Sequence, residues 1–330
     1  TMKLMIFIIS LFLFLSCGNK GNNIGHNMEL TITPSMQKKA SSTVAFSLLA
    51  PSVMIDWGDG TEIEYTLPMK KDHKGIFIFE KVSHNYSDPG KSYTIKVRTT
   101  DLIAIDLDSM RLQKLKIGKC TQLKVFKASG LGINYLDFSG CSELVNLYLG
   151  NNNITSLDLS ENPMIEDLDL SNNRLTSLNI SKSPNLRYLD CNNNKLTAID
   201  LSNNLILSTL YISKNSLSML DISKNTALIS LSCNENPLKS LDLNNNNRLS
   251  SLYCMKTQVS SVNISDSNSL ITVFLEDNQL GVEALNRIYT LLPKNESSVY
   301  LWASHNPGFE ASDKSIARKK NWVFNTIRKK

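Results

Sequence analysis

The sequence predicts a mainly β fold in which a stack of short strands forms most of the chain. Two observations indicate the stack. A 21-residue unit recurs without insertion over residues 102–280, and each unit contains an apolar-x-apolar step, often Leu-x-Leu, that places both apolar side chains on one face of a short strand. A third observation sets the flanks: strand-like runs with Gly- and Asp-rich turns precede the array, and a helical spacing of apolar residues follows it.

The repeat places apolar residues and asparagines at fixed positions. Counted from the first leucine of a unit, such as Leu144, apolar side chains fall at offsets 0, 3, 5, 10, 13 and 15. Coils stacked at ~4.8 Å line these side chains into one continuous core. We expect the asparagines at offset 8 to form a structural ladder, because their carboxamides can bond the turning backbone and the asparagine of the next coil. These are Asn152, Asn173, Asn194, Asn215, Asn236 and Asn278, with Thr257 as the exception.

The pattern Leu-x-x-Leu-x-Leu-x-x-Asn resembles leucine-rich repeats. Its 21-residue form, with a second half of the type LDLSxN, resembles the bacterial subclass called IRREKO. The resemblance implies a right-handed solenoid over residues 102–280, with short parallel strands on two sides and little helix.

The segment before the array carries two motifs, "MIDWGDGT" and "HNYSDPGKSYTIKV". Together they resemble PKD-type domains, which implies an Ig-like β-sandwich over residues 28–101 that also covers the open edge of the first coil. Trp57 would then belong to the core. Turn hydrogen bonding is the expected role of Asp56 and Asp59, with a calcium site as the alternative.

Residues 281–330 are expected to form a C-terminal cap. "GVEALNRIYTLLP" has helical spacing and ends at Pro293, "SVYLWASHNPG" is typical of a strand and turn, and "SDKSIARKKNW" indicates a short helix with Ser312 as its N-cap. The segment resembles the caps of secreted Bacteroidetes repeat proteins. Trp302 and Trp322 are expected in the core of this cap.

The first residues indicate export. The apolar run "LMIFIISLFLFL" is too short to span a bilayer and is typical of a signal peptide over residues 1–16. Leu15-Ser16-Cys17-Gly18 resembles a bacterial lipobox, which implies lipid attachment at Cys17, a flexible tether over residues 17–27, and anchoring at the outer membrane or cell surface. An ordinary cleaved signal with a leftover cysteine is the alternative, and the periplasmic or outer face stays open.

We find no constellation of acids, bases or nucleophiles typical of an enzyme, and the sequence predicts no cofactor and no metal. The four histidines all lie outside the repeats, with no metal-ligand spacing. Cys120 and Cys141 share offset 18 one coil apart, so they are either a disulfide or two reduced buried groups. An aspartate column at offset 14 suggests a cation ladder, although neighbouring hydroxyls also explain it: Asp137, Asp158, Asp200, Asp221 and Asp242.

The candidate binding surface is the outward column at offset 4. Aromatic residues recur there and at offset 2, where solubility would favour Thr, Lys or Glu, and tyrosine supplies large contact area with a polar tip. The candidates are Tyr148, Tyr188, Tyr211, Tyr253 and Phe274. Strand propensity is the competing explanation. We hypothesise a protein partner, with a glycan ligand or a purely structural envelope role as alternatives. The net charge of +5 is mild and indicates no nucleic-acid surface.

Overall fold

The computed structural model describes residues 28–33, 42–73, 77–108 and 110–324. The predicted signal peptide, Cys17 and the tether lie outside these residues. The chain divides into two compact units, one formed by Thr1–Leu131 with Gly140–Glu143 and the other by Gly132–Ser139 with Leu144–Lys330. No helix within the described ranges combines the length and apolar character needed to cross a membrane.

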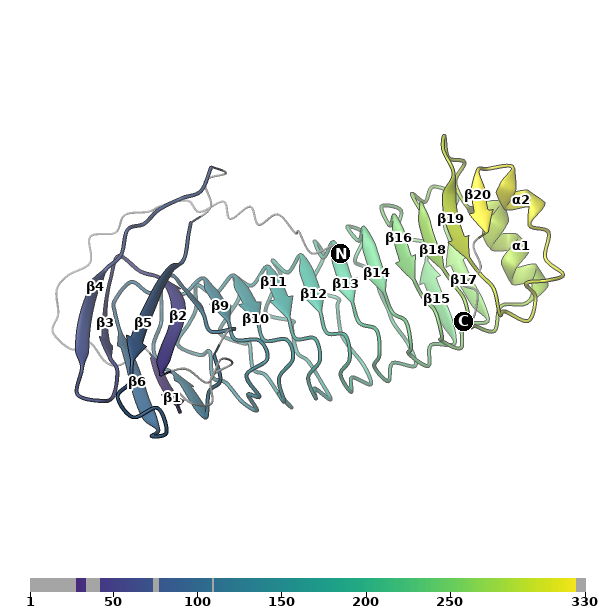
Figure 1. Ribbon diagram of the computed structural model, residues 1–330. Helices are drawn as coiled ribbons and strands as arrows, with labels where there is room; N and C mark the ends of the chain where they lie inside the picture. The colour runs from purple at the N-terminus through teal and green to yellow at the C-terminus, as the bar shows by residue number, and fades with distance from the viewer. Residues whose placement is uncertain (1–27, 34–41, 74–76, 109, 325–330) are drawn as a thin grey trace. The chain divides into compact units, whose positions relative to one another are not determined.

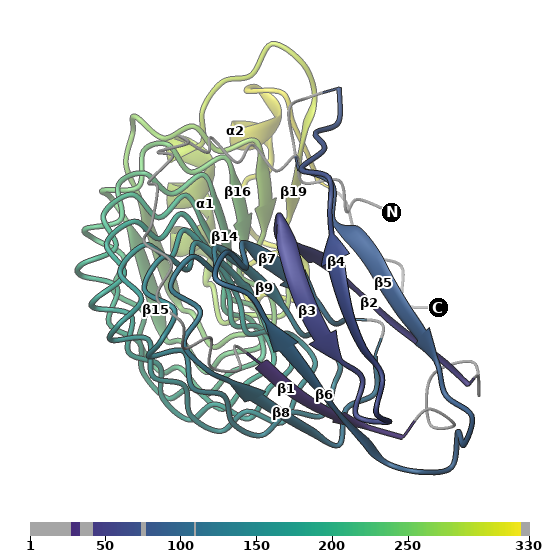
Figure 2. The same ribbon diagram turned by 90° about the vertical axis from the view of Figure 1, so that its left-hand side faces the viewer.

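The first unit contains two groups of mainly antiparallel strands (Figure 2). In spatial order, one sheet is β4 (Glu62–Thr66), β3 (Ser52–Asp56), β6 (Tyr93–Arg98), β1 (Met28–Ile32) and β8 (Lys114–Ile117). The other group is β5 (Glu80–Asn85), β2 (Thr43–Leu49), β7 (Ala104–Asp106) and β9 (Val125–Lys127), of which β7 and β9 pair in parallel.

Trp57 lies in the core of this unit, as predicted. It is fully buried directly after β3, and its ring centroid is 5.9 Å from that of Phe46 in β2, so side chains from both groups of strands meet there. Asp56 and Asp59 act in the turn: Asp56 Oδ1 accepts the Gly58 N–H at 2.9 Å, and Asp59 Oδ1 accepts the Thr61 N–H at 3.0 Å. Turn hydrogen bonding therefore explains both aspartates.

The second unit is a β-solenoid, which confirms the stacked-coil prediction. Its parallel strands can be followed in a row in Figure 1. They are β10 (Asn146–Tyr148), β11 (Asp167–Asp169), β12 (Tyr188–Asp190), β13 (Thr209–Tyr211), β14 (Ser230–Ser232), β16 (Ser251–Tyr253), β18 (Thr272–Phe274), β19 (Val299–Trp302) and β20 (Trp322–Phe324). Neighbouring repeat strands pair one whole unit apart, as in Leu168 opposite Leu189. The middle residue of each repeat strand is buried, so the leucines stack into one core.

Strands on the second side of the solenoid are fewer than the resemblance implied. Among the described residues only β15 (Ser240–Leu243) and β17 (Ser261–Ile264) form a sheet there. Earlier coils carry a single inter-coil backbone hydrogen bond on this side, such as Arg174 N–H to Ile154 O at 2.9 Å, which is too few for a ladder. The apolar core and the asparagines hold those coils together instead.

The last segment contains the helix α1 (Val282–Leu291), which precedes β19 in the chain, and the short helix α2 (Ser315–Arg318), which follows it. Trp322 is buried, as expected. The prediction that Ser312 caps α2 is wrong: the Ser315 N–H bonds Asp313 Oδ1 at 3.0 Å, while Ser312 Oγ bonds the Phe309 carbonyl. The N-cap residue of α2 is Lys314, whose side chain makes no capping bond, and the carboxylate of Asp313 just before it accepts the first helical amide instead.

Candidate functional site

The offset-8 asparagines bond the backbone of two successive coils. Asn236 Nδ2 donates to Cys233 O at 3.1 Å in its own coil and to Ile212 O at 2.9 Å in the preceding coil, whereas its Oδ1 accepts the Leu217 N–H at 3.0 Å. Asn173, Asn194 and Asn215 repeat this geometry. Asn278 makes the two carbonyl bonds, but its Oδ1 accepts the backbone N–H and the hydroxyl of Thr257, the residue that replaces asparagine in the preceding coil. The expected bond between carboxamides of neighbouring coils does not occur among these residues, because each oxygen is taken by a backbone amide.

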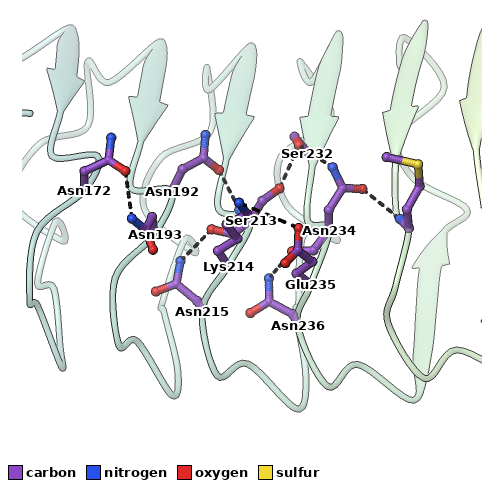
Figure 3. Close-up of polar contacts among 11 residues, drawn as sticks. Asn172, Asn192, Asn193, Ser213, Lys214, Asn215, Ser232, Asn234, Glu235 and Asn236 are labelled. Atoms are coloured by element: carbon purple, nitrogen blue, oxygen red, sulfur yellow. Dashed lines mark hydrogen bonds and ion pairs between the residues drawn. The ribbon is translucent and has the colours of Figure 1, made fainter. Parts of the chain in front are cut away.

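A second polar column, at offset 7, was not anticipated from the sequence. Its residues adopt positive φ between 52° and 60°: Asn151, Asn172, Asn193, Lys214, Glu235, Lys256, Asp277 and the matching His305. This conformation turns the chain after each strand and suits asparagine better than lysine or glutamate. Figure 3 shows the bond from Asn193 Nδ2 to Asn172 Oδ1, at 2.8 Å, in this column. The run of three asparagines that begins at Asn151 was the sequence feature from which this column could have been predicted.

The outward positions of β10 to β14, β16, β18 and β19 form one surface, here called the strand face. It comprises Asn146, Tyr148, Asp167, Asp169, Tyr188, Asp190, Thr209, Tyr211, Ser230, Ser232, Ser251, Tyr253, Thr272, Phe274, Tyr300 and Trp302. All five predicted aromatic residues lie on it, half-buried. Polar side chains beside the strand face form hydrogen bonds between neighbouring coils. For example, Asn192 Oδ1 accepts the Ser213 N–H at 2.6 Å (Figure 3).

The C-terminal end of this face carries an aromatic strip formed by Tyr253, Phe274, Trp302 and Tyr300. Tyr253 and Phe274 stack with ring centroids 4.9 Å apart, and Phe274 and Trp302 stack at 3.9 Å with planes 7° apart. Tyr300 lies against Trp302 at 5.5 Å and is 49% exposed. The prediction that Trp302 is core is wrong, because β19 pairs with β18 in a register that puts Trp302 opposite Phe274.

The other end of the face carries an acidic patch of three aspartates and three tyrosines: Asp167, Asp169, Asp190, Tyr148, Tyr188 and Tyr211. Asn146 Nδ2 donates to Asp167 Oδ2 at 2.7 Å, and the Tyr148 hydroxyl donates to the same oxygen at 3.5 Å. Burial, with a smaller contribution from Glu166, raises the pKa of Asp167.

The tyrosines of this patch are well packed. Burial raises the pKa of both Tyr148 and Tyr188, with further contributions from Asp167 and Asp190 respectively. Tyr188 and Tyr211 meet edge to face at 5.8 Å. The structure thus brings the predicted residues together as two groups, separated by the serines of β14.

The aspartates at offset 14 serve local turns. In each of Asp137, Asp158, Asp200 and Asp221 the Oδ1 accepts the N–H of the serine two residues on, at 2.9 Å. Hydrogen bonds from those serines lower the pKa of all four carboxyls. Among the described residues, no group of three or more His, Cys, Asp or Glu side chains is placed to hold a metal ion.

The cysteines within the described residues are buried and unlinked. Cys120 and Cys141 are buried and are not joined in a disulfide, so the reduced alternative holds for this pair. Cys191, Cys233 and Cys254 lie at the core offset 5, where they replace leucine or isoleucine. Burial raises the pKa of the Cys191 thiol, which makes it a poor nucleophile.

Comparisons with known proteins agree with the repeat geometry. The family described as Leucine Rich repeats (2 copies) matches residues 163–204. No curated protein matches the chain.

Among solved structures, YopM from Yersinia enterocolitica shares 26% identity and a TM-score of 0.51, over 62% of this chain and 42% of that one. The LRIM1/APL1C complex shares 22% identity and a TM-score of 0.50, over 61% of this chain and 36% of that one. The functional domain of InlJ from Listeria monocytogenes, which includes a cysteine ladder, shares 27% identity and a TM-score of 0.45, over 56% of this chain and 45% of that one. The chain spans less than half of each of these proteins. Repeat, solenoid and family match together identify it as a leucine-rich repeat protein.

Proposed function

We propose that this protein is a lipid-anchored cell-envelope scaffold, from a Bacteroidetes-like bacterium, that binds a protein partner through the strand face. Leucine-rich repeat proteins are commonly protein-interaction modules, and one of the similar structures is a complex of two proteins. The observation that carries the proposal is the aromatic strip, in which large apolar rings stand on the outward side of a rigid parallel sheet. Such rings supply contact area at low entropic cost.

The stacking geometry favours a protein over a glycan. Phe274 lies between Tyr253 and Trp302 with its planes nearly parallel to theirs, so neighbouring rings cover both of its faces. Recognition of a sugar needs an open ring face, whereas ring edges suit the carbonyl and apolar groups of a polypeptide. A glycan is the second candidate because Tyr188 and Tyr211 meet edge to face rather than stacked. A structural envelope role without a discrete ligand is the third.

The anchor and the origin rest on the sequence. The apolar run that stops at Cys17 supports the lipoprotein assignment and hence export to the outer membrane or cell surface. The WGDG motif and the two groups of strands in the first unit support a PKD-like module before the solenoid. A binding scaffold, rather than an enzyme, is the role we assign to the whole chain.

The proposal is tested by capture with the purified chain. Wild type and the strip variant Tyr253→Ala, Phe274→Ala, Trp302→Ala are presented to bacterial envelope extracts, host-cell extracts and a glycan panel. The matched control is Tyr135→Ala, Met219→Ala, which removes exposed apolar side chains elsewhere on the same unit; these are 66% and 79% exposed. Melting curves of all three proteins must agree before capture is compared.

We expect a protein that is held by wild type and by the control but lost by the strip variant. If the strip variant loses capture and a soluble glycan also blocks capture by wild type, the ligand would be a glycan, the second candidate, instead of a protein. Equal capture by all three proteins would refute the aromatic strip as the binding site.

A further inference from the structure

The strand face is free of basic residues although the chain as a whole is basic. The sequence holds 35 Lys and Arg against 30 Asp and Glu. None of that positive charge occupies an outward position of the eight strands from β10 to β19, whereas Asp167, Asp169 and Asp190 do. The residues next to these columns are basic in places, as at Arg187 and Lys214. The face therefore has a charge opposite to that of its own chain.

The acids are arranged at a cost to the fold. Asp169 of β11 lies directly opposite Asp190 of β12 in the parallel register. Strands are spaced ~4.8 Å apart, and like charges directly opposite each other destabilise a sheet. A local arrangement that opposes stability is expected where function requires it.

The carboxylates are also fixed in place before any partner arrives. Asp169 Oδ1 accepts the Ser171 N–H at 2.9 Å, and Asp190 Oδ1 accepts the Asn192 N–H at 2.9 Å. Asp167 is held by Asn146. Groups held in one orientation lose little freedom on binding, which favours affinity.

Tyrosines surround these acids on the sheet. Tyr148 of β10 lies opposite Asp169 of β11 in the parallel register. Tyr211 of β13 lies opposite Asp190 of β12. Tyr188 lies opposite Asp167. Each carboxylate thus has an aromatic neighbour at the strand spacing. Carboxylate beside aromatic ring is the combination that suits a planar cation, which forms forked hydrogen bonds and packs against rings.

From this juxtaposition we infer that the acidic patch binds guanidinium groups on an extended, arginine-bearing segment of the protein partner. The inference rests on the proposed function and names the chemistry of the partner at one end of the strand face. Arginine fits better than lysine because a compact ammonium cannot pair with a carboxylate through two parallel bonds or stack on a ring. The aromatic strip then contacts apolar parts of the same partner.

Synthetic peptides that alternate Gly with Arg, with Lys or with Glu test the inference. Binding to the purified chain is followed by fluorescence anisotropy over a salt series. The face variant is Asp167→Asn, Asp169→Asn, Asp190→Asn. The matched control, Asp158→Asn, Asp200→Asn, Asp221→Asn, removes the same charge from the turn column, where Asn179 shows that asparagine makes the same turn bond to the Ser181 N–H.

We expect the arginine peptide to bind more tightly than the lysine peptide, and the glutamate peptide not to bind. The face variant should lose about tenfold in affinity for the arginine peptide, and the control should lose less than about twofold. A structural role for the acids predicts a lower melting temperature for Asp169→Asn, whereas removal of like-charge repulsion predicts a higher one.

Three results would overturn the inference: no binding of the arginine peptide, equal affinity for the arginine and lysine peptides, or equal loss in the face and control variants. The capture experiment with the strip variant stands apart from these results, because that variant keeps all three acids. Failure of the arginine chemistry and failure of the binding face can therefore be distinguished.

Discussion

The offset-8 asparagines give the sharpest stability prediction, and Asn236→Ala is the change that tests it best. Asn236 is only 1% exposed, and its carboxamide bonds four backbone groups on two successive coils, the fourth being the Asn234 carbonyl at 3.3 Å. The substitution removes all four bonds while leaving the leucine core in place. Because the site is buried, water has little access to replace them.

The magnitude follows from the groups left behind. The Leu217 N–H loses its acceptor at 3.0 Å, and an unsatisfied buried group costs about 1–3 kcal/mol. The carbonyls of Ile212 and Cys233 each lose a donor but need less compensation. We expect a total loss of about 3 kcal/mol, or a fall in melting temperature of about 6–12 °C for a unit of this size. Asn194→Ala should cost about 1–2 kcal/mol, because Asn194 is only half-buried.

The assay combines chemical denaturation with hydrogen exchange. Denaturation gives the loss in free energy of unfolding, and exchange reports whether the Leu217 amide loses protection, as a local break requires. Asn245→Ala is the control: Asn245 is exposed, and its carboxamide also bonds a backbone carbonyl, Ser223 O at 3.2 Å. An unchanged unfolding midpoint for Asn236→Ala, or equal effects for Asn236→Ala and Asn245→Ala, would refute the reasoning.

Three other predictions concern the anchor, the turns and acid stability. Cys17→Ser should abolish membrane attachment; unchanged partitioning into a detergent phase would contradict the lipoprotein proposal. Lys214→Asn should stabilise the fold by about 0.5–1 kcal/mol by relieving a φ of 58°, at the loss of one exposed ion pair; a lower melting temperature would count against it. The pKa of Asp158 is depressed, so its contribution is present above its usual value of 3.8 and lost as the pH falls through its folded value. Asp158→Asn should flatten this acid dependence, as measured by denaturation midpoints across that range.

The solenoid could be predicted from the sequence because its signal is periodic. The same residue type recurs at offset 3 and at offset 8 in most coils, so the role of each position could be predicted from many copies along the chain. The turn column at offset 7 was not predicted, because its residue types change along the chain. After Asn193 it continues as Lys214 and Glu235, two residues that give no sign of a left-handed backbone.

The cap shows a different limit of sequence reasoning. Trp302 lies in a segment where the 21-residue period has ended, and a tryptophan beside Leu301 is equally consistent with a core or an outward position. Only the pairing of β19 with β18 decides, by placing Leu301 opposite Val273 and Trp302 opposite Phe274. The longest aromatic stack of the candidate site therefore depends on a register that the sequence does not encode in any local pattern.

The two sides of each strand have different roles, and this difference explains how the strand face can hold like charges next to each other. Leucine stacking and the carboxamide bonds of the offset-8 asparagines act on the buried side and supply most of the stability of each coil. Asp169 opposite Asp190 then costs stability that the buried side can absorb. Under selection for stability alone such a pair would be replaced, for example by the Ser230 and Ser251 found opposite each other further along the same sheet. The presence of paired acids between tyrosines thus favours recognition over strand propensity as the reason for the composition of this face.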